Sequence, residues 1–190
     1  MAIISKYLKL NNKLKKDTVV ATVMSNLGLN KYSENNNLGL IQTKVGDRYV
    51  LEEMLKNDYN FGGEQSGHVI MLDYNPTGDG ILTSLMLLTA ILNENKKVSE
   101  VRKIINIYPQ VLINAKVASD KKYDYEKDEE IQKEIKALEE EFSGNGRVLI
   151  RPSGTEPKCK FYFSIKGTDA KDAADKTAVF QKDMMNIIGE

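Results

Sequence analysis

Cysteine and histidine are nearly absent from this sequence of 190 residues, which contains one of each, Cys159 and His68. A single cysteine excludes an internal disulfide and any metal site built from several cysteines. With only these two residues as soft ligands, we expect no structural zinc site. One cysteine is what we expect of a protein from the reducing cytoplasm.

The sequence also lacks an excess of either charge, since 27 Lys and Arg residues balance 27 Asp and Glu residues. A nucleic-acid-binding surface requires a basic excess on one face, so we expect no nucleic-acid partner. The longest apolar run, residues 81–92, is too short to span a bilayer and indicates a buried helix. The first residues do not have the pattern of a signal peptide. We therefore expect a cytoplasmic protein without a membrane partner.

Strand and helix patterns alternate in the first half of the chain. The run at residues 18–24 is rich in β-branched residues with little polar interruption, which predicts a strand buried on both faces. Such alternation is typical of an α/β layered domain with a mixed, mainly parallel sheet, which we place at residues 1–105. The other expected strands are 40–45 and 69–72, and the expected helices are 3–10, a short one after Ser25 and Asn26, 47–57, 81–92 and 99–105 with Ser99 as its cap. The helix at 81–92 is expected to turn its leucines inward: Leu82, Leu85, Leu88 and Leu92.

The second half, which follows a candidate linker at residues 106–109, has another pattern. Strands with alternating apolar residues are followed or separated by amphipathic helices. This order is typical of a small α+β domain with an antiparallel sheet and its helices on one face, which we place at residues 110–190. The expected strands are 111–117, 147–150 and 161–165, the last two paired as a hairpin, and the expected helices are 131–142 and 169–188.

The segment Gly62–His68 combines three glycines with an acid, an amide, a hydroxyl group and the single histidine. Glycine lets the backbone approach a ligand closely, as Gly63 would here. Glu64 can accept two hydrogen bonds from adjacent hydroxyl groups, and Ser66 adds a donor and an acceptor, which together suit a polyol. A tight turn before a strand, with His68 as a structural residue, is the alternative. The G-x-S-x-G spacing of a serine hydrolase is absent around Ser66.

The segment at residues 151–157, Arg-Pro-Ser-Gly-Thr-Glu-Pro, has the residue types of an anion site. Arg151 offers a fork of donors that suits phosphate. Ser153 and Thr155 offer hydroxyl groups, and Gly154 allows consecutive backbone N–H groups to point at one anion. We therefore predict a phosphate site, with a plain hairpin connection and an exposed arginine as the alternative. It is not a Walker A loop, because G-x-x-x-x-G-K-[ST] is absent.

Two further turns precede helices. Gly46 to Arg48 follows a strand at the place where ligands bind in open α/β sheets. Asp47 is expected to cap the helix, which leaves Arg48 free to reach a substrate. At residues 77–80 the acidic series of a calcium loop is incomplete, so we predict a capped turn and no metal site.

Together these segments resemble the α-D-phosphohexomutase family, and within it the bacterial phosphoglucosamine mutases. The matching segments run in order along the chain: residues 22–28, 45–50, 62–68, 77–80 and 151–157. The resemblance implies that the family's third domain contacts sugar hydroxyl groups through Gly63, Glu64 and Ser66. It implies that the fourth domain holds the phosphate that is not transferred, through Arg151, Ser153, Gly154 and Thr155. Asp47 and Arg48 would be supporting residues near the reacting centre.

The resemblance covers only the last two of the family's four domains. The family transfers phosphoryl groups from a phosphoserine in its first domain, beside a Mg²⁺ ion held by a D-G-D-x-D-R loop in its second, and neither segment is present in this sequence. The resemblance therefore implies that the catalytic residues and the Mg²⁺ ligands of the intact enzyme lie outside this chain. We expect the chain to act as a C-terminal fragment, with the N-terminal domains as its partners, and to be inactive by itself.

The resemblance implies that the intact enzyme interconverts glucosamine 6-phosphate and glucosamine 1-phosphate, a step of cell-wall precursor synthesis. One segment departs from this pattern, since residues 158–163, Lys-Cys-Lys-Phe-Tyr-Phe, look more like the glucose and mannose branch. The ligand is thus a hexosamine or a hexose phosphate, and a phosphoglucomutase or phosphomannomutase fragment is one alternative. A non-catalytic sugar-phosphate binding module and an interaction domain are the others.

Overall fold

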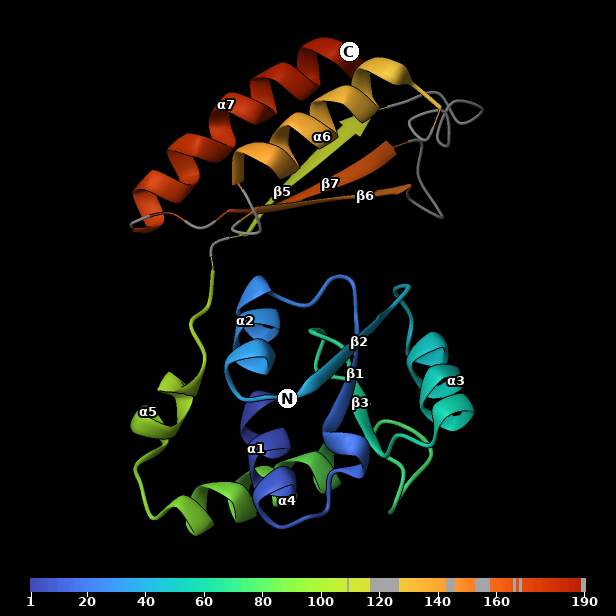
Figure 1. Ribbon diagram of the computed structural model, residues 1–190, viewed down its shortest axis with the longest axis vertical. Helices are drawn as coiled ribbons and strands as arrows, with labels where there is room; N and C mark the ends of the chain where they lie inside the picture. Colours follow the sequence, from blue (N-terminus) through green and yellow to red (C-terminus); the bar gives the residue numbers. More distant parts are fainter. Residues whose placement is uncertain are drawn as a thin grey trace. The chain divides into compact units, whose positions relative to one another are not determined.

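The computed structural model describes residues 1–108, 110–116, 127–142, 146–152, 158–165, 167 and 169–188. The chain forms two compact units, Met1–Ile107 and Tyr108–Glu190 (Figure 1). Each unit has its own sheet, and we describe each by itself. Among the described residues, none belongs to a helix both long and apolar enough to cross a membrane.

The first unit is an α/β layered domain. In its sheet, β1 lies between β2 and β3 and runs parallel to both, while β4 pairs antiparallel with β3. This arrangement confirms the predicted mixed, mainly parallel sheet. The strands are β1 (Thr18–Thr22), β2 (Gly39–Thr43), β3 (Phe61–Gly63) and β4 (Val69–Met71). The helices are α1 (Ala2–Leu10), α2 (Leu27–Asn35), α3 (Asp47–Asn57), α4 (Gly80–Glu94) and α5 (Val98–Val101), with short 3-10 helices at Lys15–Asp17 and Arg102–Ile104.

Strand β1 is buried along its whole length, as predicted, because helices cover both faces of the sheet. Val19 and Ala21 face a core shared with residues of α1, α2 and α4. Val20 faces the opposite side, where Val50 and Met54 of α3 pack against it. Figure 1 shows α3 on one side of the sheet and α1 and α2 on the other.

Strand β3 was not predicted, because glycines have low strand propensity and Gly62 and Gly63 were assigned to a loop. Close packing explains why glycine is required there. A Cβ atom on Gly62 would lie 2.8 Å from the carbonyl oxygen of Val20 and 2.7 Å from Sδ of Met54. At Gly62 the strand therefore lies directly against the side chains of Val50 and Met54 of α3, and this brings the following loop close to that helix.

Helix α4 is not the buried helix that the sequence predicted. Leu82 packs against the core, but Leu85, Leu88 and Leu92 are exposed. The prediction was wrong because residues 80–93 carry no charge, so the sequence offers no contrast between an inner and an outer face. The next helix also differs: α5 begins after Lys97, so Ser99 lies within the helix and does not cap it.

The second unit is a small α+β domain, as predicted, with strands β5 (Gln110–Lys116), β6 (Gly146–Pro152) and β7 (Lys158–Ile165) in the antiparallel order β5-β7-β6. The predicted hairpin is therefore correct. Figure 1 shows α6 (Glu129–Phe142) and α7 (Ala170–Ile188) on one face of this sheet. Alternate residues of β7 form the core beneath them: Cys159, Phe161 and Phe163.

Candidate functional site

The segment at residues 62–68 forms the connection between β3 and β4. Its turn is closed by hydrogen bonds from the Glu64 N–H group to the His68 carbonyl oxygen, at 2.8 Å, and from the Gly67 N–H group to the Glu64 carbonyl oxygen, at 3.1 Å. Gly67 has φ +97°, a conformation that favours glycine. The segment is thus a tight turn, and Gln65 and Ser66 at its tip are exposed to solvent.

Glu64 links this turn to the start of α3. Its Oε1 atom accepts a hydrogen bond from the Gly46 N–H group at 3.0 Å. Gly46 follows β2 and Glu64 follows β3, and because β2 and β3 are both parallel to β1, the two residues lie at the carboxyl edge of the sheet. This is the edge at which open α/β sheets bind ligands.

His68 and Asp47 meet at the same edge. The His68 Nε2 atom lies 3.6 Å from Oδ2 of Asp47. Gly78, in the loop before α4, lies directly behind the imidazole ring, and a Cβ atom on it would come within 2.6 Å of Nε2. Three segments that are distant in sequence are therefore brought together: Gly46–Asp47, Glu64–His68 and Gly78.

The N-terminus of α3 differs from the prediction. Gly46, with φ +133°, occupies the N-cap position, and Asp47 is the first helical residue and does not cap the helix. Asp47 is well placed for the helix dipole, which favours an acidic residue in the first turn. The position of Asp47 beside His68 could have been inferred only from the fold, because the two residues are 21 positions apart in sequence.

Arg48 is not free, contrary to expectation. Its Nε atom donates to Oε1 of Glu52 at 2.7 Å, one helical turn further on. This hydrogen bond raises the pKa of Arg48 above its ordinary value. The side chain is 81% exposed, so the pair is weak and a ligand could displace Glu52.

The loop at residues 77–80 is the capped turn that the sequence predicted. Asp79 caps α4, and its Oδ1 atom accepts a hydrogen bond from the Leu82 N–H group at 2.9 Å. This bond holds the pKa of Asp79 below its ordinary value. Among the described residues, no three His, Cys, Asp or Glu side chains are grouped so that they could hold a metal ion. The described part of the chain therefore does not fit a resident Mg²⁺ ion.

In the second unit, Arg151 lies near the end of β6 and is exposed. Its cross-strand partner is Lys160 of β7, so two cations lie opposite each other on one face of the sheet. Like charges in directly opposite cross-strand positions repel each other, and an anion bound between the two cations would offset this repulsion. The predicted phosphate ligands Ser153, Gly154 and Thr155 lie outside the described residues.

Arg147 of β6 adds another cation to this face of the sheet, two alternate positions from Arg151. One guanidinium nitrogen is buried and has no hydrogen-bond partner among the described residues. Burial lowers the pKa of Arg147 from its ordinary value. This face of the sheet therefore carries Arg147, Arg151 and Lys160, a feature that becomes visible only once the strand register is known.

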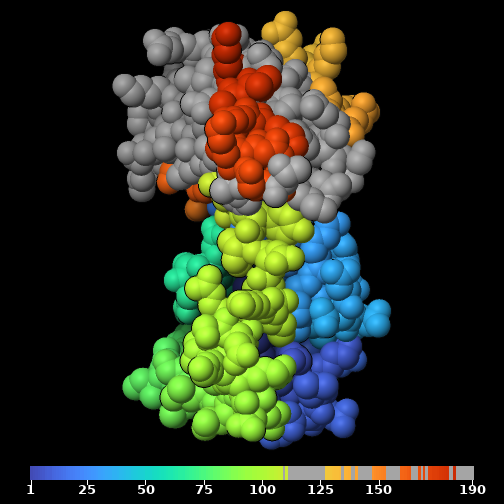
Figure 2. All heavy atoms as spheres, turned by 90° about the vertical axis from the view of Figure 1, so that its left-hand side faces the viewer, coloured from blue at the N-terminus to red at the C-terminus, as the bar shows by residue number. Residues whose placement is uncertain are grey.

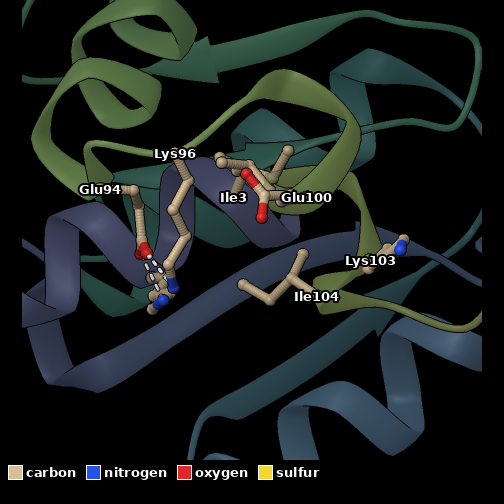
Figure 3. Close-up of a pocket in the computed structure, with 8 residues that line it drawn as sticks. Ile3, Glu94, Lys96, Glu100, Lys103 and Ile104 are labelled. Atoms are coloured by element: carbon tan, nitrogen blue, oxygen red, sulfur yellow. Dashed lines mark hydrogen bonds and ion pairs between the residues drawn. The ribbon is translucent and has the colours of Figure 1, made fainter.

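A pocket of about 240 Å³ lies elsewhere in the first unit, among α1, the end of α4 and α5. Figure 3 shows Lys96 directed at Glu94. Glu94 pairs with Lys6 and, at 3.4 Å, with Lys96, and the hydrogen bond from Lys6 lowers the pKa of Glu94. Glu94 thus pairs with two of the three lysines that line the pocket, and Lys103 is the third.

Comparison with known proteins identifies the family. The family model described as phosphoglucomutase/phosphomannomutase, alpha/beta/alpha domain III, matches residues 1–108, and the model of the family's C-terminal domain matches residues 112–181. The chain belongs to the phosphoglucomutase/phosphomannomutase family. This confirms the resemblance to the third and fourth phosphohexomutase domains.

Relatives within the family are phosphoglucosamine mutases. The chain is 54% identical to that of Ruminiclostridium cellulolyticum over 188 residues, which are 99% of this chain and 40% of the relative. It is 60% identical to that of Clostridium tetani over 157 residues, which are 83% of this chain and 35% of the relative. The chain thus spans less than half the length of these relatives.

Solved structures of the family share the fold. An Aspergillus fumigatus N-acetylphosphoglucosamine mutase, in complex with GlcNAc-6P and magnesium, matches with a TM-score of 0.73 and 18% identity over 99% of this chain and 42% of its own. A Paramecium phosphoglucomutase matches with a TM-score of 0.71 and 16% identity over 100% of this chain and 41% of its own. At such low identity these likenesses establish the fold alone.

Proposed function

We propose that this chain forms the sugar-holding and phosphate-holding domains of a phosphoglucosamine mutase, which interconverts glucosamine 6-phosphate and glucosamine 1-phosphate. The observation that carries the proposal is the convergence of Glu64, Asp47 and His68 at the carboxyl edge of a parallel sheet. The segments that supply these residues are among those on which the family resemblance rests. The identity of 54–60% to curated phosphoglucosamine mutases supports glucosamine over glucose or mannose as the sugar.

The first unit would hold the sugar. One oxygen of Glu64 is engaged by the Gly46 N–H group, which fixes the carboxylate and leaves the other oxygen for a sugar hydroxyl group. Ser66 is exposed at the tip of the turn and can donate to or accept from a second hydroxyl group. Gly63 would serve by packing, because a Cβ atom on it would lie 2.5 Å from the His68 carbonyl oxygen.

The second unit would hold the phosphate that is not being transferred. Arg151 and Lys160 place two cations on one sheet face, and Ser153, Gly154 and Thr155 would add hydroxyl and N–H donors. Catalysis of phosphoryl transfer depends mainly on positioning and on neutralising charge. The chain would supply the positioning, with Asp47 and Arg48 in supporting roles.

The nucleophile and the Mg²⁺ site would belong to the preceding domains of the intact enzyme. We therefore propose that the chain alone is inactive and that it works in the cytoplasm together with those domains. A phosphoglucomutase or phosphomannomutase fragment is the second candidate, favoured by the Lys160 and Tyr162 pattern of β7.

Titration of the chain with glucosamine 6-phosphate, glucose 6-phosphate and mannose 6-phosphate, followed by NMR, tests the proposal. We expect binding to be strongest for glucosamine 6-phosphate. Loss of one neutral hydrogen bond in Ser66→Ala should weaken binding about 3- to 10-fold, and loss of a charged contact in Arg151→Ala about 10- to 100-fold. Ser99→Ala and Lys171→Ala are matched controls. Both residues are exposed, and they lie on helices α5 and α7, outside the two proposed binding loops.

Two results would count against the proposal. If no sugar phosphate shifts the resonances of Ser66 or Arg151, the loops are structural and the chain is an interaction domain. If binding is strong but unchanged in both variants, the ligand occupies another surface.

A further inference from the structure

The outer face of α4 is an apolar stripe. It consists of Ile81, Leu85, Leu88 and Leu92, which are 77%, 58%, 55% and 77% exposed. Their spacing of four, three and four residues places them in one line along the helix, as in a seam between packed helices. Contiguous apolar patches of this kind on a protein surface mark interaction sites.

The polar residues beside this apolar stripe use their hydroxyl groups for hydrogen bonds within α4. The Ser84 hydroxyl group donates to the Gly80 carbonyl oxygen at 2.7 Å, and the Thr89 hydroxyl group donates to the Leu85 carbonyl oxygen at 2.8 Å. Both hydroxyl groups are therefore turned back onto the helix itself. Residues 80–93 contain no charged side chain, and Glu94 at the end of the helix pairs with Lys6. A helix with apolar residues on both its inner and its outer face is normally buried on both.

The inner side of α4 is already covered within the first unit. Leu82, Met86 and Leu87 pack against the core that contains Ile4 and Leu8 of α1. This chain matches 40% or less of the length of the relatives. In those relatives, the rest of the polypeptide is joined to the segment that corresponds to α1. Because the matched domains are the third and the C-terminal ones, that remaining part precedes α1.

We infer that the apolar stripe of α4 is the surface onto which the domains that precede the matched region in the longer relatives would pack. The occupant would present a complementary face of uncharged aliphatic or aromatic side chains, because the stripe offers neither a charge nor a free hydroxyl group. Figure 2 shows one side of the first unit, where the chain from α4 to the end of that unit, coloured green to lime, forms part of the surface. The inference goes beyond sugar-phosphate binding, and it rests on the part of the proposed function in which the chain works with those domains.

The test uses a cysteine at position 88 and its reaction with a maleimide. Leu88→Cys is examined in the 190-residue chain and in a chimera. The chimera joins this chain to the part of the Ruminiclostridium cellulolyticum relative that precedes its matched region. Leu55→Cys is the matched control, because Leu55 is 64% exposed on α3, which covers the other face of the sheet. Cys159 is buried and gives a low background.

We expect position 88 to react rapidly in the chain alone. In the chimera its rate, relative to position 55, should fall about tenfold or more, since a buried thiol reacts only when the interface opens. An unchanged ratio would overturn the inference. So would a chimera that fails to unfold cooperatively, because the surfaces of a relative 54% identical should be complementary. Protection of position 88 in the chain alone, with a dimer seen by light scattering, would assign the stripe to a second copy of the chain.

The sugar-phosphate titration of the Leu88→Cys chain separates this inference from the proposed function. The apolar stripe and the ligand-holding loops involve different residues, so we expect unchanged binding whether or not the stripe is covered in the chimera. Loss of docking with retained sugar binding would overturn this inference and leave the sugar-phosphate binding of the proposed function intact.

Discussion

Substitution of Gly78 by alanine should disturb the site by displacing the His68 ring, while every polar residue of the site is kept. The Cβ atom of Gly78→Ala would lie 2.5 Å from Nδ1 and 2.6 Å from Nε2 of His68, and carbon and nitrogen atoms do not approach so closely. The imidazole ring must therefore move by about 1 Å, and with it the contact of 3.6 Å to Asp47 changes. Overpacking of this kind costs about 1–3 kcal/mol.

For a domain of this size, each 1 kcal/mol lowers Tm by about 4–8 °C. We therefore expect Gly78→Ala to unfold at clearly lower temperature, measured by circular dichroism. The matched control is Gly80→Ala, two residues further on, where a Cβ atom meets nothing within 4 Å. Gly80 is the first residue of α4, so alanine there should leave stability unchanged or raise it slightly.

Because His68 is the only histidine of the chain, its ring protons give a unique NMR signal. We expect this signal to shift in Gly78→Ala and not in Gly80→Ala. Equal stability of the two variants together with an unshifted His68 signal would refute the packing of Gly78 against the ring.

Two further predictions concern other parts of the first unit. Gly28→Ala should destabilise the unit by about 1–3 kcal/mol in urea unfolding, because its Cβ atom would collide with the backbone carbonyl group of Asn106; retention of wild-type stability would contradict this close approach. The carboxylate of Asp79 is stabilised in the folded chain, so its contribution is present above about pH 4 and is lost as the pH falls through the lowered pKa. The stability of the wild type should thus decline more steeply below about pH 4 than that of Asp79→Asn, which caps the helix without titrating, and parallel pH profiles would contradict this role.

The sequence pattern was sufficient where one physical signal dominates. Strand β1 was predicted because a run of β-branched residues without polar interruption is typical of a strand buried on both faces. The hairpin of β6 and β7 was predicted because Phe161 and Phe163 alternate with polar residues. The capped turn at residues 77–80 was predicted from its spacing, and Asp79 is the residue that caps α4.

Elsewhere the outcome depends on tertiary contacts that local patterns do not contain. Strand β3 contains two glycines because the Val20 carbonyl group and α3 leave no room for a side chain at Gly62, and the His68 carbonyl group leaves none at Gly63. Arg48 finds Glu52 on its own helix, a pairing that residue spacing permits but does not require. The outward direction of Leu85 and Leu88 could not be inferred, because an apolar helix without charges gives no indication of which face meets the core.

The site was predicted as separate motifs and not as an arrangement. The residues Glu64, Asp47 and His68 were each noted, but the hydrogen bond from Gly46 to Glu64 and the contact between Asp47 and His68 follow from the parallel order of β2, β1 and β3. The role of Gly78 behind the imidazole ring was missed. Its only sequence signal was a second glycine-containing turn just after the one that contains the histidine.

The most direct measurement is mutase activity with glucosamine 6-phosphate and glucosamine 1-phosphate, for the chain alone and for its chimera with the preceding domains of the Ruminiclostridium cellulolyticum relative. We expect turnover by the chimera, reduced by Ser66→Ala and Arg151→Ala, and none by the chain alone. Turnover by the 190-residue chain alone would contradict the proposal that it positions the substrate and that the preceding domains supply the nucleophile.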